Sequence, residues 1–119
     1  MSAIMPETPL PLNVAVRECL QMAPPTALPM TYHRLAETLG LQPPRTIARV
    51  TQALEASMRE DAAEERPFIA ALVVSRRAPH MPARGFFELA VALGRFPDDT
   101  ALHAQAWRDE YQRALTQRE

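Results

Sequence analysis

Few side chains in this sequence have the type and spacing that covalent chemistry requires. The single cysteine, Cys19, lies at apolar helical spacing with Val16 and Leu20. No histidine or cluster of basic residues is evident beside it to lower the pKa of its thiol. We therefore expect Cys19 to be a buried and inert thiol. One cysteine also excludes a disulfide within the chain.

The other residue types typical of catalysis or metal binding are scattered. His33, His80 and His103 show no ligand spacing with cysteine or acidic partners, so no metal site is predicted. The pair Asp98-Asp99 is typical of a helix cap. No glycine-rich phosphate loop and no hydrolase nucleophile motif is present. The sequence therefore predicts a protein that is not an enzyme and has no cofactor, and no small-molecule substrate is evident.

Arginine is the residue type with the most suggestive distribution. All 13 Lys and Arg side chains are Arg, and a planar guanidinium suits phosphate or carboxylate. A biased genomic base composition would also produce this usage and is the simpler explanation. The formal net charge of −1 gives the whole molecule no attraction to nucleic acid or to an anionic membrane. Any binding of anions must therefore come from a local patch.

One group of arginines shares a face of a predicted helix that begins at Pro43-Pro44 and ends near Glu60. Apolar side chains at helical spacing mark the side of this helix that should face the core. The opposite side carries Arg45, Arg49 and Arg59. We expect these three guanidinium groups to form a row that faces outward.

A second group follows a short apolar segment. Arg76, Arg77 and Arg84 lie in a proline-containing loop that would be the wing of a winged helix, beside the row on the preceding helix. The two groups would then form one patch facing phosphate. Equally, these arginines would be neutralised if they paired with the acidic run from Asp61 to Glu65, which we expect to be a solvated connector.

The elements that must position these residues follow from helical periodicity and from the prolines. We predict an irregular tail (residues 1–11) and a single domain (12–119) with an α+β, mostly helical fold. This fold would be a winged-helix-like unit of three helices, with one or two short strands and C-terminal helices. The predicted helices span 13–22, 31–39, 43–60, 88–93 and 100–117, with a strand at 67–74 and either a second strand or a direct helix start at 85–87.

The second and third predicted helices meet the demands of a helix-turn-helix. Ala36 is small where the helices would cross, Gly40 lies in the turn, and Ile47 and Val50 are a pair of apolar residues. The turn is one residue longer than usual. A packed corner of two helices that touches no DNA satisfies the same pattern, so both interpretations stay open.

The motif Thr31-Tyr32-x-x-Leu35-Ala36, with Gly40 and a following helix and strand, adds a resemblance. Residues 13–87 resemble the DNA-binding domain of the alkylguanine-DNA alkyltransferases and of their catalytically inactive alkyltransferase-like relatives. The resemblance implies that Tyr32 lies near the DNA backbone. It also makes Arg45, one position early, the nearest match to the arginine that this family inserts into the DNA helix.

The departures from this family concern its chemistry. If Val73-Val74 align with the Val-Val of the family's Pro-Cys-His-Arg-Val-Val segment, then Ala70 stands where the reactive cysteine would be. Ala71 and Leu72 would replace its His and Arg. Alkyl transfer needs an activated thiolate, and these three apolar side chains provide none. The resemblance therefore implies a DNA-binding scaffold without the transfer reaction.

The C-terminal helix carries Trp107 and Tyr111 on one side. We expect this side to close the core, with a dimer or partner surface as the alternative. The longest apolar run, from Phe68 to Val74, is too short to span a bilayer, and the start lacks a signal-peptide pattern, so a cytoplasmic protein is expected. The leading hypothesis is a non-enzymatic module that binds double-stranded DNA, compatible with repair, phage defence or regulation. The alternative is a protein-interaction or adaptor domain, which would include self-association as a homodimer.

Overall fold

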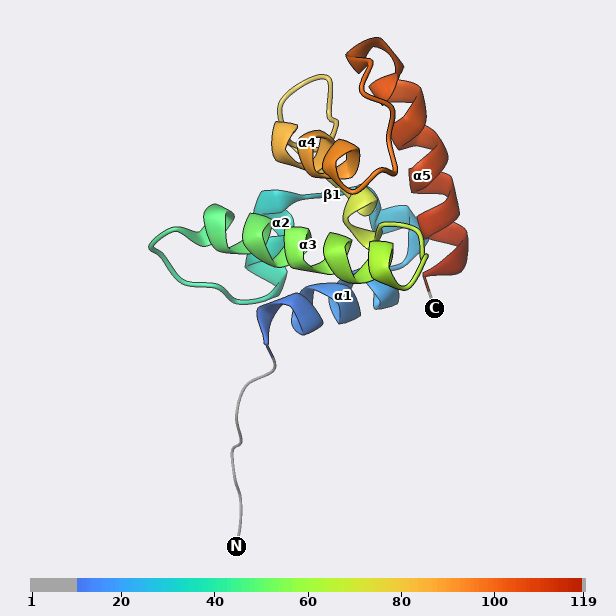
Figure 1. The fold of residues 1–119 in the computed structure, drawn as a ribbon. Coiled ribbons are helices and arrows are strands. Elements are labelled where there is room, and N and C mark those ends of the chain that lie inside the picture. Colours follow the sequence, from blue (N-terminus) through green and yellow to red (C-terminus); the bar gives the residue numbers. More distant parts are fainter. Residues whose placement is uncertain (1–10, 119) are drawn as a thin grey trace, which may run out of the picture.

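The computed structural model describes residues 11–118, so the predicted tail lies almost wholly outside the described residues. The fold is α+β and mostly helical, as predicted (Figure 1). The α-helices are α1 (Leu12–Met22), α2 (Tyr32–Thr38), α3 (Thr46–Ala63), α4 (Arg84–Ala92) and α5 (His103–Gln117). The fold also contains three short 3-10 helices, η1 (Pro25–Ala27), η2 (Ile69–Leu72) and η3 (Thr100–Leu102). Its two strands are β1 (Met30–Thr31) and β2 (Val73–Val74).

The two strands pair in parallel, with Met30 opposite Val73 and Thr31 opposite Val74. The predicted strand at 67–74 is therefore wrong over most of its length, because residues 69–72 form η2 instead. Residues 85–87 belong to α4, so the second of the two predicted alternatives for this segment is the correct one. The sheet within the described part of the chain joins β1 to β2, and the loop after β2 runs directly into α4.

Backbone hydrogen bonds define the ends of α2 and α4. Gly40, with φ +70°, ends α2, and its N–H donates to Glu37 O at 3.0 Å while the next N–H, of Leu41, donates to Ala36 O at 3.1 Å. These two bonds are a Schellman motif, which needs a left-handed residue and usually takes glycine. Gly94 ends α4 in the same way, with φ +78°. Both glycine stops were predicted and are confirmed.

The start of α3 differs from the prediction. Thr46 is its first residue, so Pro43 and Pro44 lie in the turn and not in the first helical turn. Arg45 has a left-handed backbone with φ 62°, which stops the helix from extending back through Pro44. Pro44 also disfavours a helical conformation for the residue before it. Arg45 therefore lies just ahead of α3, in the α2–α3 turn.

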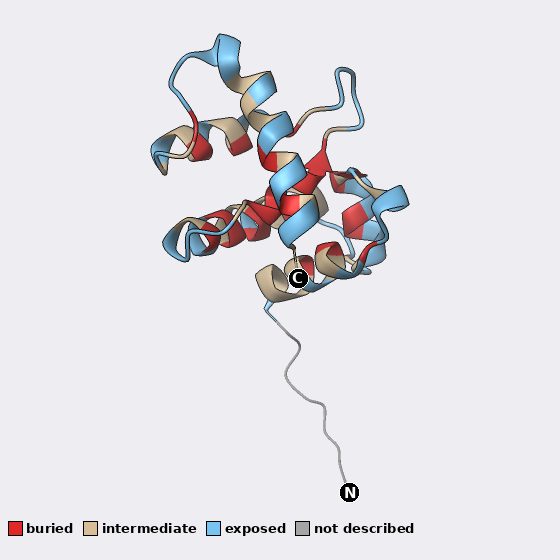
Figure 2. Cartoon of the chain, turned by 90° about the vertical axis from the view of Figure 1, so that its right-hand side faces the viewer, coloured by how far each residue is buried: buried red, intermediate tan, exposed pale blue. Residues whose placement is uncertain are grey.

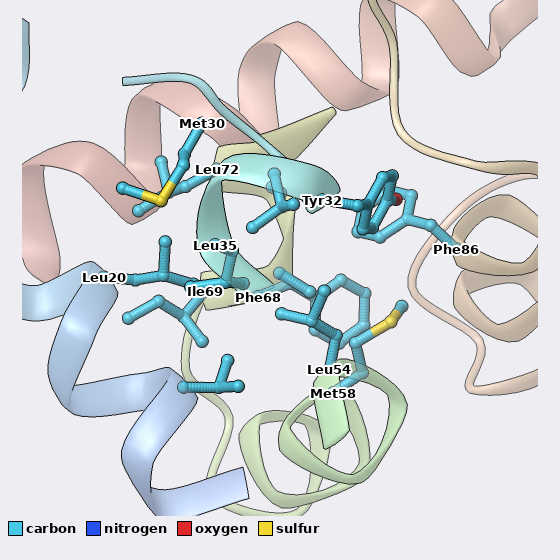
Figure 3. Packing of buried hydrophobic residues seen from close by; sticks show 14 of the residues in the cluster. Leu20, Met30, Tyr32, Leu35, Leu54, Met58, Phe68, Ile69, Leu72 and Phe86 are labelled. Carbon is cyan, nitrogen blue, oxygen red and sulfur yellow. The ribbon is translucent and has the colours of Figure 1, made fainter. Parts of the chain in front are cut away.

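The core surrounds the segment from Phe68 to Val74. Every residue of this segment is at most 3 % exposed, and α1, α3 and α5 all pack against η2 (Figures 2 and 3). Phe68 is fully buried and meets the ring of Phe86 edge to face at 6.0 Å. Seven residues of central chain thus provide the surface on which the helices assemble.

Two buried carboxylates hold the beginning of this segment. Asp61 is 0 % exposed, and its Oδ2 accepts from the N–H of Ile69 at 2.9 Å. Its Oδ1 lies 2.9 Å from Arg17 Nη1 and 3.1 Å from Arg66 Nε. The prediction that residues 61–65 form a solvated connector is therefore wrong at Asp61, because this carboxylate continues the buried side of α3.

Glu110 of α5 accepts a backbone hydrogen bond in the same way from Phe68, the residue before Ile69. It is also 0 % exposed, and its Oε2 accepts from the N–H of Phe68 at 2.7 Å. Arg95 Nη1 lies 2.8 Å from the same oxygen, and Arg113 pairs with Oε1. Two successive backbone N–H groups at the start of η2 thus donate to ion-paired carboxylates and not to a neighbouring strand.

We expect Asp61→Ala to lower the free energy of unfolding by about 3–5 kcal/mol, because it removes one partner from a buried ion pair and leaves the N–H of Ile69 without an acceptor. Glu60→Ala is the matched control. Glu60 also pairs with Arg17, but its side chain is 47 % exposed, so its loss should cost about 0–1 kcal/mol. Urea denaturation measures both, and equal losses would contradict the structural role given to Asp61.

A second stability prediction concerns the end of α3. Glu65 occupies the left-handed position of another Schellman motif, with φ 58°, where most L-residues are strained. We expect Glu65→Gly to raise the free energy of unfolding by about 0.5–1 kcal/mol. Glu64→Gly is the control, because Glu64 has φ −95° and glycine there only adds freedom to the unfolded chain. A loss of stability in Glu65→Gly would contradict this account.

Candidate nucleic-acid interface

Helix α3 buries the apolar side that was predicted to face the core. Val50, Leu54 and Met58 are at most 3 % exposed and face the core. Arg45 and Arg59 are exposed, at the start and in the C-terminal half of the segment. Neither forms an ion pair with any carboxylate among residues 11–118. Both guanidinium groups therefore lie at the surface and are available to an outside anion.

Arg49 differs from its two neighbours in the row. It is only half-exposed, and its Nη2 donates to the backbone oxygen of Gln42 in the α2–α3 turn. Its Nε is buried and has no hydrogen-bond partner within the described residues. The side chain therefore folds back onto the turn, where it helps to fix the segment that carries Arg45.

The loop between β2 and α4 carries the second group of arginines. Arg76 and Arg77 are exposed, and neither has a carboxylate partner within the described part of the chain. Two hydrogen bonds close the loop on itself, from Ser75 N to Met81 O and from His80 N to Arg77 O, each 2.8 Å long. The backbone that presents these two guanidinium groups is thus held in one shape.

Arg84, the third predicted member of this group, is the first residue of α4. Its Nε lies 2.9 Å from Glu88 Oε2, with both side chains well exposed. An acidic side chain also lies where α3 meets α4, because a Cβ placed on Gly85 would be 3.1 Å from Glu55 Oε2. The expected single patch is thus interrupted by Glu55 and Glu88, and Arg84 is partly neutralised.

Tyr32 was predicted to lie near the DNA backbone, but its side chain is buried in the fold. It is 8 % exposed, and its hydroxyl accepts from the N–H of Ala83 at 2.8 Å. Burial raises the pKa of the phenol, the hydrogen bond from Ala83 lowers it, and the nearby Glu55 raises it further. Tyr32 points into the fold because α2 begins directly after β1, so its hydroxyl joins α2 to the end of the arginine-bearing loop.

The position matched to the family's reactive cysteine also lies inside the fold. Ala70 is 3 % exposed, within η2, and its neighbours Ala71 and Leu72 are fully buried. The free thiol of Cys19 is half-buried on α1, and burial raises its pKa. Residues 11–118 contain no group of three or more His, Cys, Asp or Glu side chains that could hold a metal ion.

The two C-terminal aromatic residues contact the core segment. Trp107 Nε1 donates to Ala71 O at 2.9 Å, and its ring meets Tyr111 in a T-shaped contact at 5.9 Å. Both are packed against the core but remain partly exposed. The helix therefore closes the core as expected, and the exposed parts of these rings leave the partner-surface alternative open.

The structural roles of Asp61 and Glu110 were not predicted, although the sequence carried a signal for each. Asp61 follows Leu54 and Met58 along the apolar side of α3, and Glu110 shares the buried side of α5 with Ala114. A charged residue at an apolar helical position indicates a buried ion pair when arginines are available. No cavity was predicted beside Met81, Phe87 and Val91, because its lining comes from three separate segments.

Comparisons with protein-family models, with curated proteins and with solved structures found no match. The resemblance to the alkyltransferase family therefore stays a prediction. Within residues 11–118 no helix combines the length and the apolar character that crossing a bilayer would need.

We expect Tyr32→Phe to lower the free energy of unfolding at neutral pH by about 1 kcal/mol, because the N–H of Ala83 loses its acceptor. The phenol pKa is raised in the folded state, so the stability linked to it is present below the unfolded pKa of about 10 and is lost as the pH rises above it. The difference between wild type and variant should therefore shrink at alkaline pH. Urea denaturation across this range tests it. Tyr111→Phe is the control at neutral pH, because it also leaves one tyrosine in the chain and the Tyr111 hydroxyl accepts no hydrogen bond from residues 11–118.

Proposed function

We propose that this protein is a non-enzymatic DNA-binding module that contacts the phosphate backbone through Arg45 just ahead of α3, through Arg59 within α3, and through Arg76 and Arg77 in the loop after β2. One observation carries the proposal. All four side chains are exposed and have no carboxylate partner among residues 11–118. Five other arginines of the same chain are paired with carboxylates: Arg17, Arg66, Arg84, Arg95 and Arg113.

The acidic run does not neutralise these four arginines. Its first member, Asp61, is buried and pairs with Arg17 and Arg66. Glu64 and Glu65 are exposed at the end of α3 and form no ion pair within the described residues. The alternative in which this run covers the arginine row therefore loses its main support, which favours the proposal.

The expected mode of binding is electrostatic and sensitive to salt. A guanidinium group donates up to two parallel hydrogen bonds to a phosphate and releases counterions from the DNA. Four such contacts would make log K fall with log salt concentration at a slope of about −3 to −4. With a formal net charge of −1, the whole molecule gives no long-range attraction, so binding depends on these local groups.

The second candidate is a protein-interaction module that uses α5. The rings of Trp107 and Tyr111 on this helix meet at 5.9 Å, and both side chains are partly exposed. Partly exposed aromatic side chains are typical of interfaces. Sedimentation of the purified protein tests self-association through this surface.

The DNA proposal is tested by fluorescence anisotropy with a duplex of random sequence at several salt concentrations from about 50 to 200 mM. Each of Arg45→Ala, Arg59→Ala, Arg76→Ala and Arg77→Ala should weaken binding and reduce the salt slope by about one. Arg108→Ala is the control with the same change of charge, because Arg108 is exposed on α5 and its side chain, among residues 11–118, bonds only to Gln105. Absence of binding at the lowest salt, or wild-type slopes in all four variants, would refute the proposal.

A further inference from the structure

A cavity of about 690 Å³ opens between the loop after β2, α4 and the segment that leads into α5. Its apolar lining includes Met81 and Pro82 from the loop and Phe87 and Val91 from α4. Arg77 and His103 belong to its polar lining. Its volume lies within the range of about 300–1,000 Å³ that is typical of sites for small molecules.

Hydrogen bonds and ring stacking hold all three walls of this cavity. The loop is closed by the hydrogen bonds between Ser75 and Met81 and between His80 and Arg77. Phe87 stacks on His103 at 5.3 Å with an angle of 4° between the rings, which joins α4 to α5. His103 Nε2 also lies 2.8 Å from Pro97 O, which fixes the ring. The site is therefore preformed, and little ordering is needed when a ligand enters.

The charges of the lining indicate the kind of ligand. Arg84 and Glu88 neutralise each other at 2.9 Å. Arg77 has no carboxylate partner among residues 11–118, and the loop that carries it has no acidic residue between Ser75 and Ala83. The remaining carboxylate, Asp98, comes from the α5 side of the cavity. An apolar body with one anionic group on the loop side matches this arrangement.

We propose that this cavity binds a small aromatic anion, with its rings among Met81, Phe87 and Val91 and its anionic group on the guanidinium of Arg77. The inference goes beyond the DNA proposal, because no residue of α3 lines the cavity. No small-molecule substrate was evident from the sequence, so this site adds a ligand class that the sequence did not indicate. Arg77 belongs to both proposals, so the test below uses variants that separate them.

The probes are 1-anilinonaphthalene-8-sulfonate, an aromatic anion, and N-phenyl-1-naphthylamine, which has the same rings without the sulfonate. Fluorescence titration of the purified full chain should show saturable binding of the anion. Arg77→Ala should weaken it about tenfold, which corresponds to about 1.4 kcal/mol, and leave binding of the neutral probe unchanged. Arg76→Ala is the matched control, because Arg76 is adjacent and exposed but does not line the cavity.

Val91→Glu places a carboxylate in the cavity and should weaken both probes. Met81→Glu repeats this test from the loop, in case the first variant fails to fold. The proposal is overturned if the anion does not saturate, if Arg76→Ala and Arg77→Ala weaken it equally, or if neither glutamate variant affects it. Loss of DNA binding in Arg45→Ala with unchanged binding of the anion would show that the two sites are independent. Absence of DNA binding with intact binding of the anion would refute only the DNA proposal.

Discussion

The fold depends on two buried carboxylates that accept consecutive backbone N–H groups. Asp61 holds the N–H of Ile69, and Glu110 holds the N–H of Phe68. A buried carboxylate is costly unless it is paired and hydrogen-bonded, and each of these two meets a pair of arginines. Those arginines come from α1, from α5 and from the segments that follow α3 and α4. The two ion-pair clusters thus join most of the helices to the start of η2.

This anchoring explains why an apolar, β-branched segment is not a long strand. The N–H groups of residues 68 and 69 are already used, so the chain turns through η2 and only Val73–Val74 remain extended. β2 then pairs with β1, and α2 begins directly after β1. As a result, Tyr32 lies close enough to accept from the N–H of Ala83 and to fix the end of the loop. The shape of the loop that carries Arg76 and Arg77 therefore follows from contacts deep in the core.

The same residue type has two different roles in this molecule. Arg17, Arg66 and Arg95 neutralise the buried carboxylates and act as structural cations. Arg45 and Arg59 remain exposed and without a carboxylate partner in the described part of the chain. A near-zero net charge hides this division, because it does not show which arginines are paired with carboxylates and which are not. Electrostatic function in such a protein depends on which cations are left unpaired, and a sum over the sequence does not show this.

The sequence by itself determined the helices, their glycine stops and the face that α3 buries, because helical periodicity, capping and left-handed turns are local properties. Thr31 accepts from Arg34 N as its type predicts, and Asp99 accepts from Ala101 N. Only the tertiary structure decided how far the strand extends, whether Tyr32 faces solvent, and which arginines are paired. Each of these depends on groups far apart in the chain, such as Phe68 and Glu110, whose meeting no local pattern specifies. The cavity beside the loop has the same origin, since three segments must fold together before it exists.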